Sequence, residues 1–147
     1  MHEVGELLAR SVPVPPKVAI IHNDLKLDNC QLRADDPDRV TSVFDWDMAT
    51  LGDPLFDLGL MLTSMSGNAG VWTLSNDDAV ARYQERSGID IEHMDWYLAF
   101  AAWRTAVVVQ QLANRYRAGD STDERLASFA DVVPGLAARA HDLLARR

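Results

Sequence analysis

The chain has 147 residues, of which 48% are hydrophobic, with one cysteine and a formal net charge of −8 at pH 7. This length predicts a single domain, residues 1–147, that buries a core without a disulfide framework. The acidic balance excludes nucleic acid as an expected partner, because phosphate contacts need clustered Lys and Arg. No apolar run reaches bilayer length and no signal-peptide pattern is present, so no membrane partner is expected. The single thiol predicts a reducing compartment, most simply the cytoplasm.

The first third of the chain predicts a helix, a strand and a hairpin. Residues 4–12 carry apolar side chains at helical spacing, and the prolines of "VPVPPK" end this helix. "VAIIHN" predicts a short strand rich in β-branched residues. "CQLRA" and "VTSVFDWD" flank the polar turn "DDPDR", residues 35–39, and runs separated in this way predict a β-hairpin.

From Asp53 onward the pattern is helical. Asp53 and Pro54 provide the N-cap and first residue of a helix that is apolar nearly all round, and therefore buried. Three more helical segments follow, and a small hairpin against this mainly helical body predicts an α+β fold. The three segments are expected from Asn76 or Asp77 to Gly88, from Glu92 to Ala118 with Gly119 as its end, and from Asp123 to Arg147 with an interruption or kink near Pro134 and Gly135.

Polar side chains gather where the first strand ends, in "HNDLKLDN", and again at the end of the hairpin, in "FDWD". Asp24 and Asn29 are five residues apart, and a loop that curls between them can point both side chains at one spot. Asp45, at the end of the paired strand, can reach the same spot from the other side. Two carboxylates and an amide supply only oxygen ligands, which suit Mg²⁺ with water and phosphate completing its shell.

Lys26 follows Asp24 by two residues and would bring a movable positive charge close to a phosphoryl group. Simpler interpretations stay open, because Asp and Asn often terminate strands and a single Lys in a loop is usually a solvated charge. Asp47 alternates with Asp45 onto one face and is open as a third metal acid. His22 is expected to brace the loop by hydrogen bonding, since no second His or Cys cluster has zinc-ligand spacing.

These segments resemble a known family. "HNDLKLDN" resembles the catalytic loop H-x-D-L-x-x-x-N of eukaryotic-type kinases. Together, "IIHNDLKLDN" and "VFDWDMATLGDPLFDLG" are similar to the aminoglycoside phosphotransferase or phosphotransferase-enzyme family, in which H-G-D-x-x-x-x-N precedes D-W-[DE] and G-D-P-x-x-D-L elements. "FAAWRTAVVVQQLANRYRAG" resembles the long helix of that family's acyl-CoA-dehydrogenase-associated branch. The resemblance covers most of residues 18–119 and implies the C-terminal lobe of a protein-kinase-like phosphotransferase, with the site on a small β-hairpin.

The resemblance also implies a role for each matching position. Asp24 matches the catalytic aspartate that accepts or orients the proton of the substrate hydroxyl, and Lys26 lies beside it in the motif. Asn29 and Asp45 match the residues that bind Mg²⁺ and, through it, the phosphates of ATP.

Three further positions have structural expectations. Asp53 and Asp57 match the G-D-P-x-x-D element, for which a structural role is expected. Asn23 stands where the family usually has Gly. Because Asn tolerates left-handed backbone better than most residues, the loop is expected to keep the family's conformation.

The family places a nucleotide-binding lobe with a Gly-rich loop before this region, whereas 21 residues precede His22 here. That lobe is therefore expected to be absent. The implied function is a Mg²⁺-ATP-dependent phosphotransferase lobe that acts on the hydroxyl of a small-molecule alcohol, with its independent activity left open. The alternative is a non-catalytic kinase-like interaction module whose exposed surface binds a second copy or a partner. A metal-dependent hydrolase using the same oxygens is a third interpretation.

Overall fold

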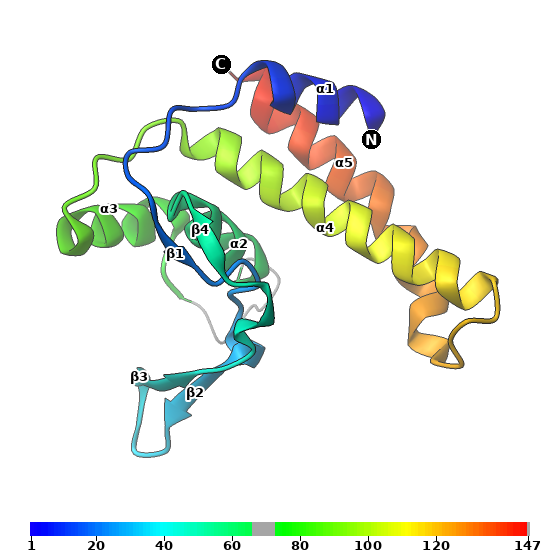
Figure 1. The fold of residues 1–147 in the computed structure, drawn as a ribbon, viewed down its shortest axis with the longest axis horizontal. Helices are drawn as coiled ribbons and strands as arrows, with labels where there is room; N and C mark the ends of the chain where they lie inside the picture. The colour runs from blue at the N-terminus through cyan, green and yellow to red at the C-terminus, as the bar shows by residue number, and fades with distance from the viewer. Residues whose placement is uncertain (66–72, 147) are drawn as a thin grey trace. The chain divides into compact units, whose positions relative to one another are not determined.

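The computed structural model describes residues 1–65 and 73–146 (Figure 1). They form two compact units, one made of Met1–Pro13 and Leu98–Arg147 and the other of Val14–Tyr97. We call them the helical unit and the site unit. The expected α+β, mainly helical class is confirmed, while the organisation of the whole chain as one domain stays a prediction. Among the described helices, none combines the length and the hydropathy that crossing a bilayer requires.

The helical unit contains α1 (His2–Arg10), most of α4 (Met94–Arg117), the 3₁₀ turn η3 (Glu124–Ser128) and α5 (Phe129–Ala145). Helices α1 and α4 confirm the first and the longest of the predicted helices, and Gly119, at φ 80°, follows the end of α4 as expected. The buried face of α4 includes alanines with no exposed surface, among them Ala99, Ala102 and Ala106. Small side chains on this face let neighbouring backbones approach α4 closely.

Of the interruption or kink predicted near Pro134 and Gly135, the interruption is wrong, whereas a kink stays a prediction. Helix α5 runs through Pro134, and the change from 3₁₀ to α-helix lies earlier, at Ser128. A proline removes one backbone hydrogen bond from a helix, but the turns on either side keep theirs. Burial of Val133 and Ala140 on one face of α5 stabilises the helix across that position.

The described residues of the site unit form two separate antiparallel strand pairs. Strand β2 (Cys30–Arg33) pairs with β3 (Asp36–Val43), which confirms the predicted hairpin. Its turn lies at residues 34–35, not at the predicted residues 35–39, because β3 already begins at Asp36. Two register shifts, opposite Gln31/Leu32 and Leu32/Arg33, accommodate the extra residues of β3. Strand β1 (Ala19–Ile21) pairs with β4 (Thr50–Gly52), a pairing that the sequence did not predict.

Two helices and the first turn of α4 support these strands. Helix α2 (Leu55–Met65) begins as predicted: Asp53 Oδ1 accepts the backbone N–H of Leu55 at 2.9 Å, and Asp53 Oδ2 accepts the Tyr97 hydroxyl at 2.7 Å. Helix α3 (Asn76–Ser87) ends at Gly88, with φ 65°, as predicted. Its N-cap is Ser75 and not Asn76 or Asp77, because the Ser75 hydroxyl accepts the backbone N–H of Asp78 at 3.1 Å.

Gly59 sets the approach of α2 to the start of α4. A Cβ atom at Gly59 would lie 2.9 Å from the Tyr97 carbonyl oxygen and 3.1 Å from its carbonyl carbon. Both atoms belong to the backbone of a helix and cannot rotate away. Only glycine therefore permits this contact, which lies next to the Tyr97–Asp53 hydrogen bond at the base of the site unit.

We predict that Gly59→Ala destabilises the protein although Ala favours a helix. The clash should cost about 1–3 kcal/mol of unfolding free energy. Gly135→Ala is the matched control, because Gly135 lies in α5 with no atom within 4 Å of an added Cβ. This control should gain about 0.5–1 kcal/mol from helix propensity alone. Urea denaturation of both variants measures the difference, and equal shifts would contradict the close contact.

Candidate active site

The first polar loop, His22–Asn29, connects β1 to β2 and brings three predicted site residues into contact. Lys26 Nζ donates to Asp24 Oδ2 at 2.8 Å. Asn29 Nδ2 donates to the backbone carbonyl of Asp24 at 2.9 Å and to Asp24 Oδ2 at 3.3 Å. Among the described residues, no hydrogen bond reaches the other carboxylate oxygen of Asp24, Oδ1. Asp24 is thus held in place through one oxygen, while the second has no donor among the described residues.

His22 joins the first polar loop to the residue that follows the hairpin. Its side chain is buried, and Nδ1 accepts the backbone N–H of Asp24 at 3.2 Å. That bond assigns the ring proton to Nε2, which donates to the carbonyl of Phe44 at 2.7 Å. The expectation that His22 braces the loop is confirmed.

Asp57 anchors the first polar loop through two backbone hydrogen bonds. One carboxylate oxygen accepts the backbone N–H of His22 at 2.7 Å and the other accepts that of Asn23 at 2.8 Å. Asp57 lies in the first turn of α2, so these bonds fix the loop on a helix. The structural role expected for Asp57 is confirmed, as is that of Asp53 at the start of the same helix.

Asn23 adopts left-handed backbone, with φ 64°, as expected for an Asn in a glycine position. The N–H groups of His22 and Asn23, which precede this left-handed position, both donate to the single carboxylate of Asp57. The Asn23 side chain also donates to the carbonyl of Met48 at 3.4 Å. The loop conformation therefore survives without glycine.

The second polar loop, Val43–Met48, carries Asp45 and contains the 3₁₀ turn η2 (Trp46–Met48). The Phe44 N–H donates to the carbonyl of Asn29 at 2.8 Å, so the residue before Asp45 is bonded to Asn29. Asp45 itself is exposed and left-handed, with φ 63° and ψ 57°. Its carboxylate makes no hydrogen bond or ion pair with the part of the chain that the structure describes. The two loops are thus joined through backbone atoms, while Asp45 projects an unengaged carboxylate.

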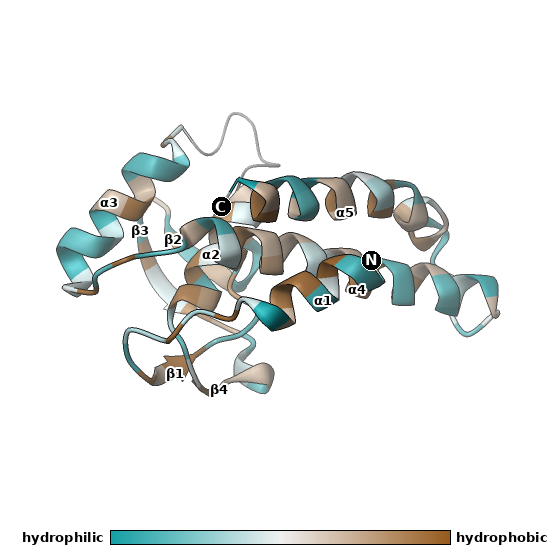
Figure 2. Cartoon of the chain, turned by 90° about the horizontal axis from the view of Figure 1, so that it is seen from above, coloured by the Kyte–Doolittle hydropathy of each residue, from teal (hydrophilic) through white to brown (hydrophobic). Residues whose placement is uncertain are grey.

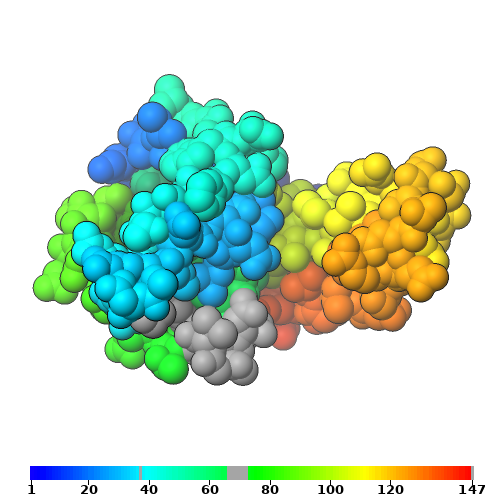
Figure 3. All heavy atoms as spheres, turned by 90° about the horizontal axis from the view of Figure 1, so that it is seen from below, coloured from blue at the N-terminus to red at the C-terminus, as the bar shows by residue number. Residues whose placement is uncertain are grey.

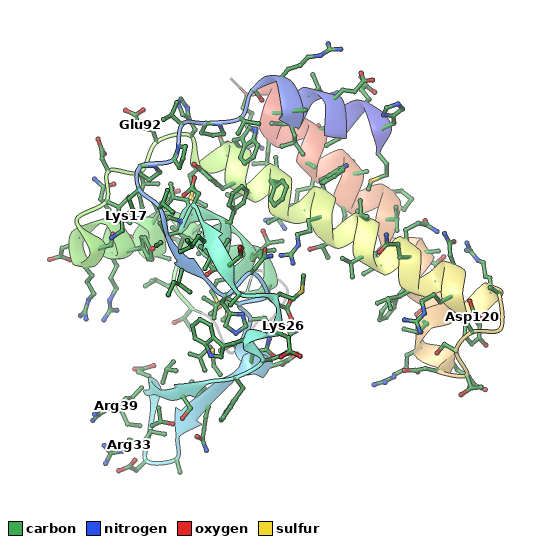
Figure 4. All side chains as sticks on the ribbon, viewed as in Figure 1. Lys17, Lys26, Arg33, Arg39, Glu92 and Asp120 are labelled. Carbon is green, nitrogen blue, oxygen red and sulfur yellow. The ribbon has the colours of Figure 1, made fainter. Side chains whose placement is uncertain are left out.

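Figures 3 and 4 show where these groups lie in the site unit. Residues of the first polar loop, in blue, and of the hairpin, in cyan, gather on one face in Figure 3. Lys26 lies at the base of the hairpin, whereas Arg33 and Arg39 lie at its far end (Figure 4). Arg33 is engaged there by the exposed Asp35, and its guanidinium holds the pKa of that carboxyl below its usual range. Lys26, unlike these two arginines, lies in the first polar loop and bonds Asp24.

The donor set fits Mg²⁺ held together with a phosphate ligand. Asn29 uses its amide nitrogen to bond Asp24, which leaves the amide oxygen for a cation. Within the described residues, no group of three or more His, Cys, Asp or Glu side chains is arranged to hold a metal ion by itself. One or two carboxylates and an amide match Mg²⁺, which usually completes its shell with water and substrate phosphates.

Two features of the site were missed at the level of sequence. Trp46 is 50% exposed and packs its ring on His22 at a centroid distance of 4.7 Å. Tyr83 of α3 lies near the anchoring acids: burial, with Asp57 and then Asp53 nearby, raises the pKa of its hydroxyl. Trp46 could have been suspected from its place between two acids, but no local pattern pointed to Tyr83.

We predict that Asn23→Gly leaves stability within about 0.5 kcal/mol of the wild type, because glycine adopts φ 64° freely. Asn23→Ala should cost about 1–2 kcal/mol, the penalty of left-handed backbone for a residue with a Cβ. Asn114 in α4 is the control, since right-handed helix reverses the order: Asn114→Ala should be more stable than Asn114→Gly. Chemical denaturation of the four variants tests this, and the same order at both positions would refute the assignment.

Comparison with known proteins gives consistent results. Residues 2–100 match the phosphotransferase enzyme family. The chain is 29% identical over 164 aligned residues to acyl-CoA dehydrogenase family member 11 of Gallus gallus and 27% identical to that of Homo sapiens, covering 99% and 93% of this chain. It spans only 21% and 19% of the length of these two curated relatives.

Solved structures show the same fold. A Ralstonia eutropha protein provisionally described as an aminoglycoside phosphotransferase superposes with a TM-score of 0.85 at 22% identity, over 99% of this chain and 48% of that one. A choline/ethanolamine kinase family protein of Mesorhizobium loti superposes with a TM-score of 0.59 at 23% identity, over 97% and 44% of the two chains. The expected kinase-like phosphotransferase fold is confirmed. With the family match extending over more than half of its residues, and with a homologous region in acyl-CoA dehydrogenase family member 11, the chain belongs to the phosphotransferase enzyme family.

Proposed function

We propose that this chain is the part of a cytoplasmic, Mg²⁺-ATP-dependent phosphotransferase that transfers a phosphoryl group to the hydroxyl of a small-molecule alcohol. The observation that carries the proposal is the hydrogen bond from Phe44 N–H to the Asn29 carbonyl, at 2.8 Å. It brings the end of the first polar loop beside the residue before Asp45. We infer that an amide oxygen from the first polar loop and a carboxylate from the second can bind one cation, the arrangement that phosphoryl transfer uses.

Asp24 is the residue proposed to orient the acceptor hydroxyl and take its proton. Its position is fixed by Asn29 and Lys26 through Oδ2, and Oδ1 faces no donor among the described residues. A general base must lie within hydrogen-bond reach of its substrate and hold its own geometry, and such an arrangement supplies both.

Lys26 is proposed to balance the charge of the transferred phosphoryl group. Its side chain and that of Asp24 are 40% and 35% exposed, and ion pairs this open contribute about 0–1 kcal/mol to stability. The pair therefore has little value as a structural link. The position of the Lys26 ammonium group, 2.8 Å from the carboxylate of the proposed base, is better explained by the binding of a negatively charged ligand.

We assign the binding of the rest of ATP to parts of such phosphotransferases that lie outside this chain. The chain covers less than half of the Ralstonia and Mesorhizobium proteins. The residues of the two polar loops are proposed to bind the cation and the hydroxyl of the acceptor. The substrate of the chain is thus proposed only as a class, a small alcohol.

We predict that Mn²⁺·ATP, with Mn²⁺ as a probe for Mg²⁺, binds this chain with a dissociation constant of about 1 mM or tighter. Asp45→Asn and Asn29→Ala should each weaken binding about tenfold or more, because the first removes the negative charge of a ligand and the second removes an oxygen ligand. Asp24→Asn should change affinity by less than about threefold, because a base is not a ligand. Isothermal titration calorimetry measures all four proteins.

Asp38→Asn is the control for these variants, because Asp38 is an exposed acid of the hairpin and lies outside both loops. It should bind like the wild type. An Asp47→Asn variant decides whether this exposed neighbour of Asp45 is a third ligand. Absence of heat from the wild type at millimolar Mn²⁺·ATP would overturn the proposed function.

A second candidate function, self-association, is favoured by one specific surface. Ile20 of β1 and Leu51 of β4 are directly opposed and are 71% and 72% exposed, with Val18 beside them at 67%. Figure 2 shows β1 and β4 in the brown of hydrophobic residues. We call these three side chains the aliphatic ribbon face. A cross-strand row of aliphatic groups in water is typical of a binding surface.

The proposed occupant of the aliphatic ribbon face is a second copy of this chain. The face carries no charge, and a two-fold axis would pack one Ile20–Leu51 row against its equivalent. A standard interface buries about 800 Å² per partner, more than three side chains supply, so the dimer should be weak. The net charge of −8 opposes association, and salt should therefore strengthen it by screening.

We predict a concentration-dependent dimer that tightens as NaCl rises. Sedimentation equilibrium between about 10 and 500 µM, a range suited to a weak interface, measures it. The double variant Ile20→Thr with Leu51→Thr keeps β-branched or polar strand residues and should remain monomeric. Val132→Thr, at a 51% exposed apolar position of α5, should leave association unchanged. A wild type that is monomeric throughout the range would exclude this function.

A further inference from the structure

Asp45 is held in an unfavourable backbone conformation. Its φ of 63° and ψ of 57° place an Asp in the left-handed region, which non-glycine residues enter only when surrounding contacts compensate. Asp45 is also exposed, so its side chain contributes no packing that would fix this conformation. The contacts that hold Asp45 must therefore come from its neighbours in the second polar loop.

The residues before Asp45 are fixed by two backbone hydrogen bonds. Phe44 N–H donates to the Asn29 carbonyl at 2.8 Å, and the Phe44 carbonyl accepts His22 Nε2 at 2.7 Å. Both bonds lie on the amino-terminal side of Asp45. They orient the chain as it enters the left-handed position but do not determine where it leaves.

The residue after Asp45 closes the loop. Trp46 Nε1 donates to the carbonyl of Val43 at 2.8 Å, so the indole reaches back across Asp45 to the end of β3. The same ring packs on His22, with centroids 4.7 Å apart and planes at 48°. Trp46 is 50% exposed, and burial alone does not account for its position. The indole therefore connects both sides of Asp45 and rests on the histidine that holds Phe44.

We propose that Trp46 is a positioning residue: its indole N–H holds Asp45 in the left-handed conformation that presents the carboxylate to the cation. The inference rests on the proposed role of Asp45 as a Mg²⁺ ligand. A phenyl ring at this position could still pack on His22 but has no N–H to donate to Val43. The hydrogen bond, and not the aromatic contact, is then what sets the population of the binding-competent loop.

The test compares Trp46→Phe with Trp103→Phe in the full chain. Trp103 is a matched control because its Nε1 also donates to a backbone carbonyl, that of Met1 at 3.1 Å, but in the helical unit. The first readout is hydrogen exchange of the Phe44 amide by NMR, and the second is Mn²⁺·ATP affinity by calorimetry. Loss of one hydrogen bond from the loop should speed exchange and weaken affinity about fivefold in Trp46→Phe. Trp103→Phe should change neither.

The outcomes separate this inference from the proposed function. If the wild type binds Mn²⁺·ATP and Trp46→Phe binds it equally well, the positioning role falls and the proposed function stands. Faster exchange at Phe44 without a loss of affinity also overturns the positioning role, since the indole would then order the loop without serving the ligand. If the wild type does not bind, both fall. Equal loss of affinity in Trp46→Phe and Trp103→Phe would indicate a general loss of stability and would likewise overturn the inference.

Discussion

The site depends on one carboxylate that takes no part in the proposed chemistry. Asp57 accepts two consecutive backbone N–H groups, from His22 and Asn23, and so ties an irregular loop to the first turn of a helix. Buried N–H groups without an acceptor are costly, and the Asp57 carboxylate supplies an acceptor for each of these two. This anchor therefore determines the positions of Asp24, Lys26 and Asn29.

His22 links the loop that follows β1, in the β1–β4 pair, to the loop that follows β3, in the β2–β3 pair. Its backbone is held by Asp57, its Nδ1 orients Asp24, and its Nε2 reaches the residue before Asp45. A single buried side chain therefore couples the proposed base to the loop of the proposed cation ligand. Neutral imidazole suits this task because it is donor and acceptor at once, on opposite sides of one rigid ring.

Sequence reasoning located the loops, the hairpin, four helices and the left-handed Asn23, because each rests on local patterns: apolar periodicity, caps and residue types that tolerate special backbone. It placed the hairpin turn wrongly, and it expected an interruption near Pro134 and Gly135 where the change from 3₁₀ to α-helix lies earlier, at Ser128. Register and packing shift such boundaries by a few residues. It could not find the β1–β4 pairing, which joins residues about thirty apart through three-residue strands. Nor could it find the Trp46–His22 contact, because an indole suits a core and a loop equally well.

Gly59 and Asp57 occupy the same two turns of α2, and the contact between Gly59 and the Tyr97 backbone fixes how deep that helix sits. The distance of Asp57 from the first polar loop is consequently set by the absence of a Cβ atom at Gly59. A relative that carries alanine at this position could not keep the same loop by changing the loop alone. It would need a compensating retreat of the α4 backbone, so the two helices and the polar loop must evolve as one unit.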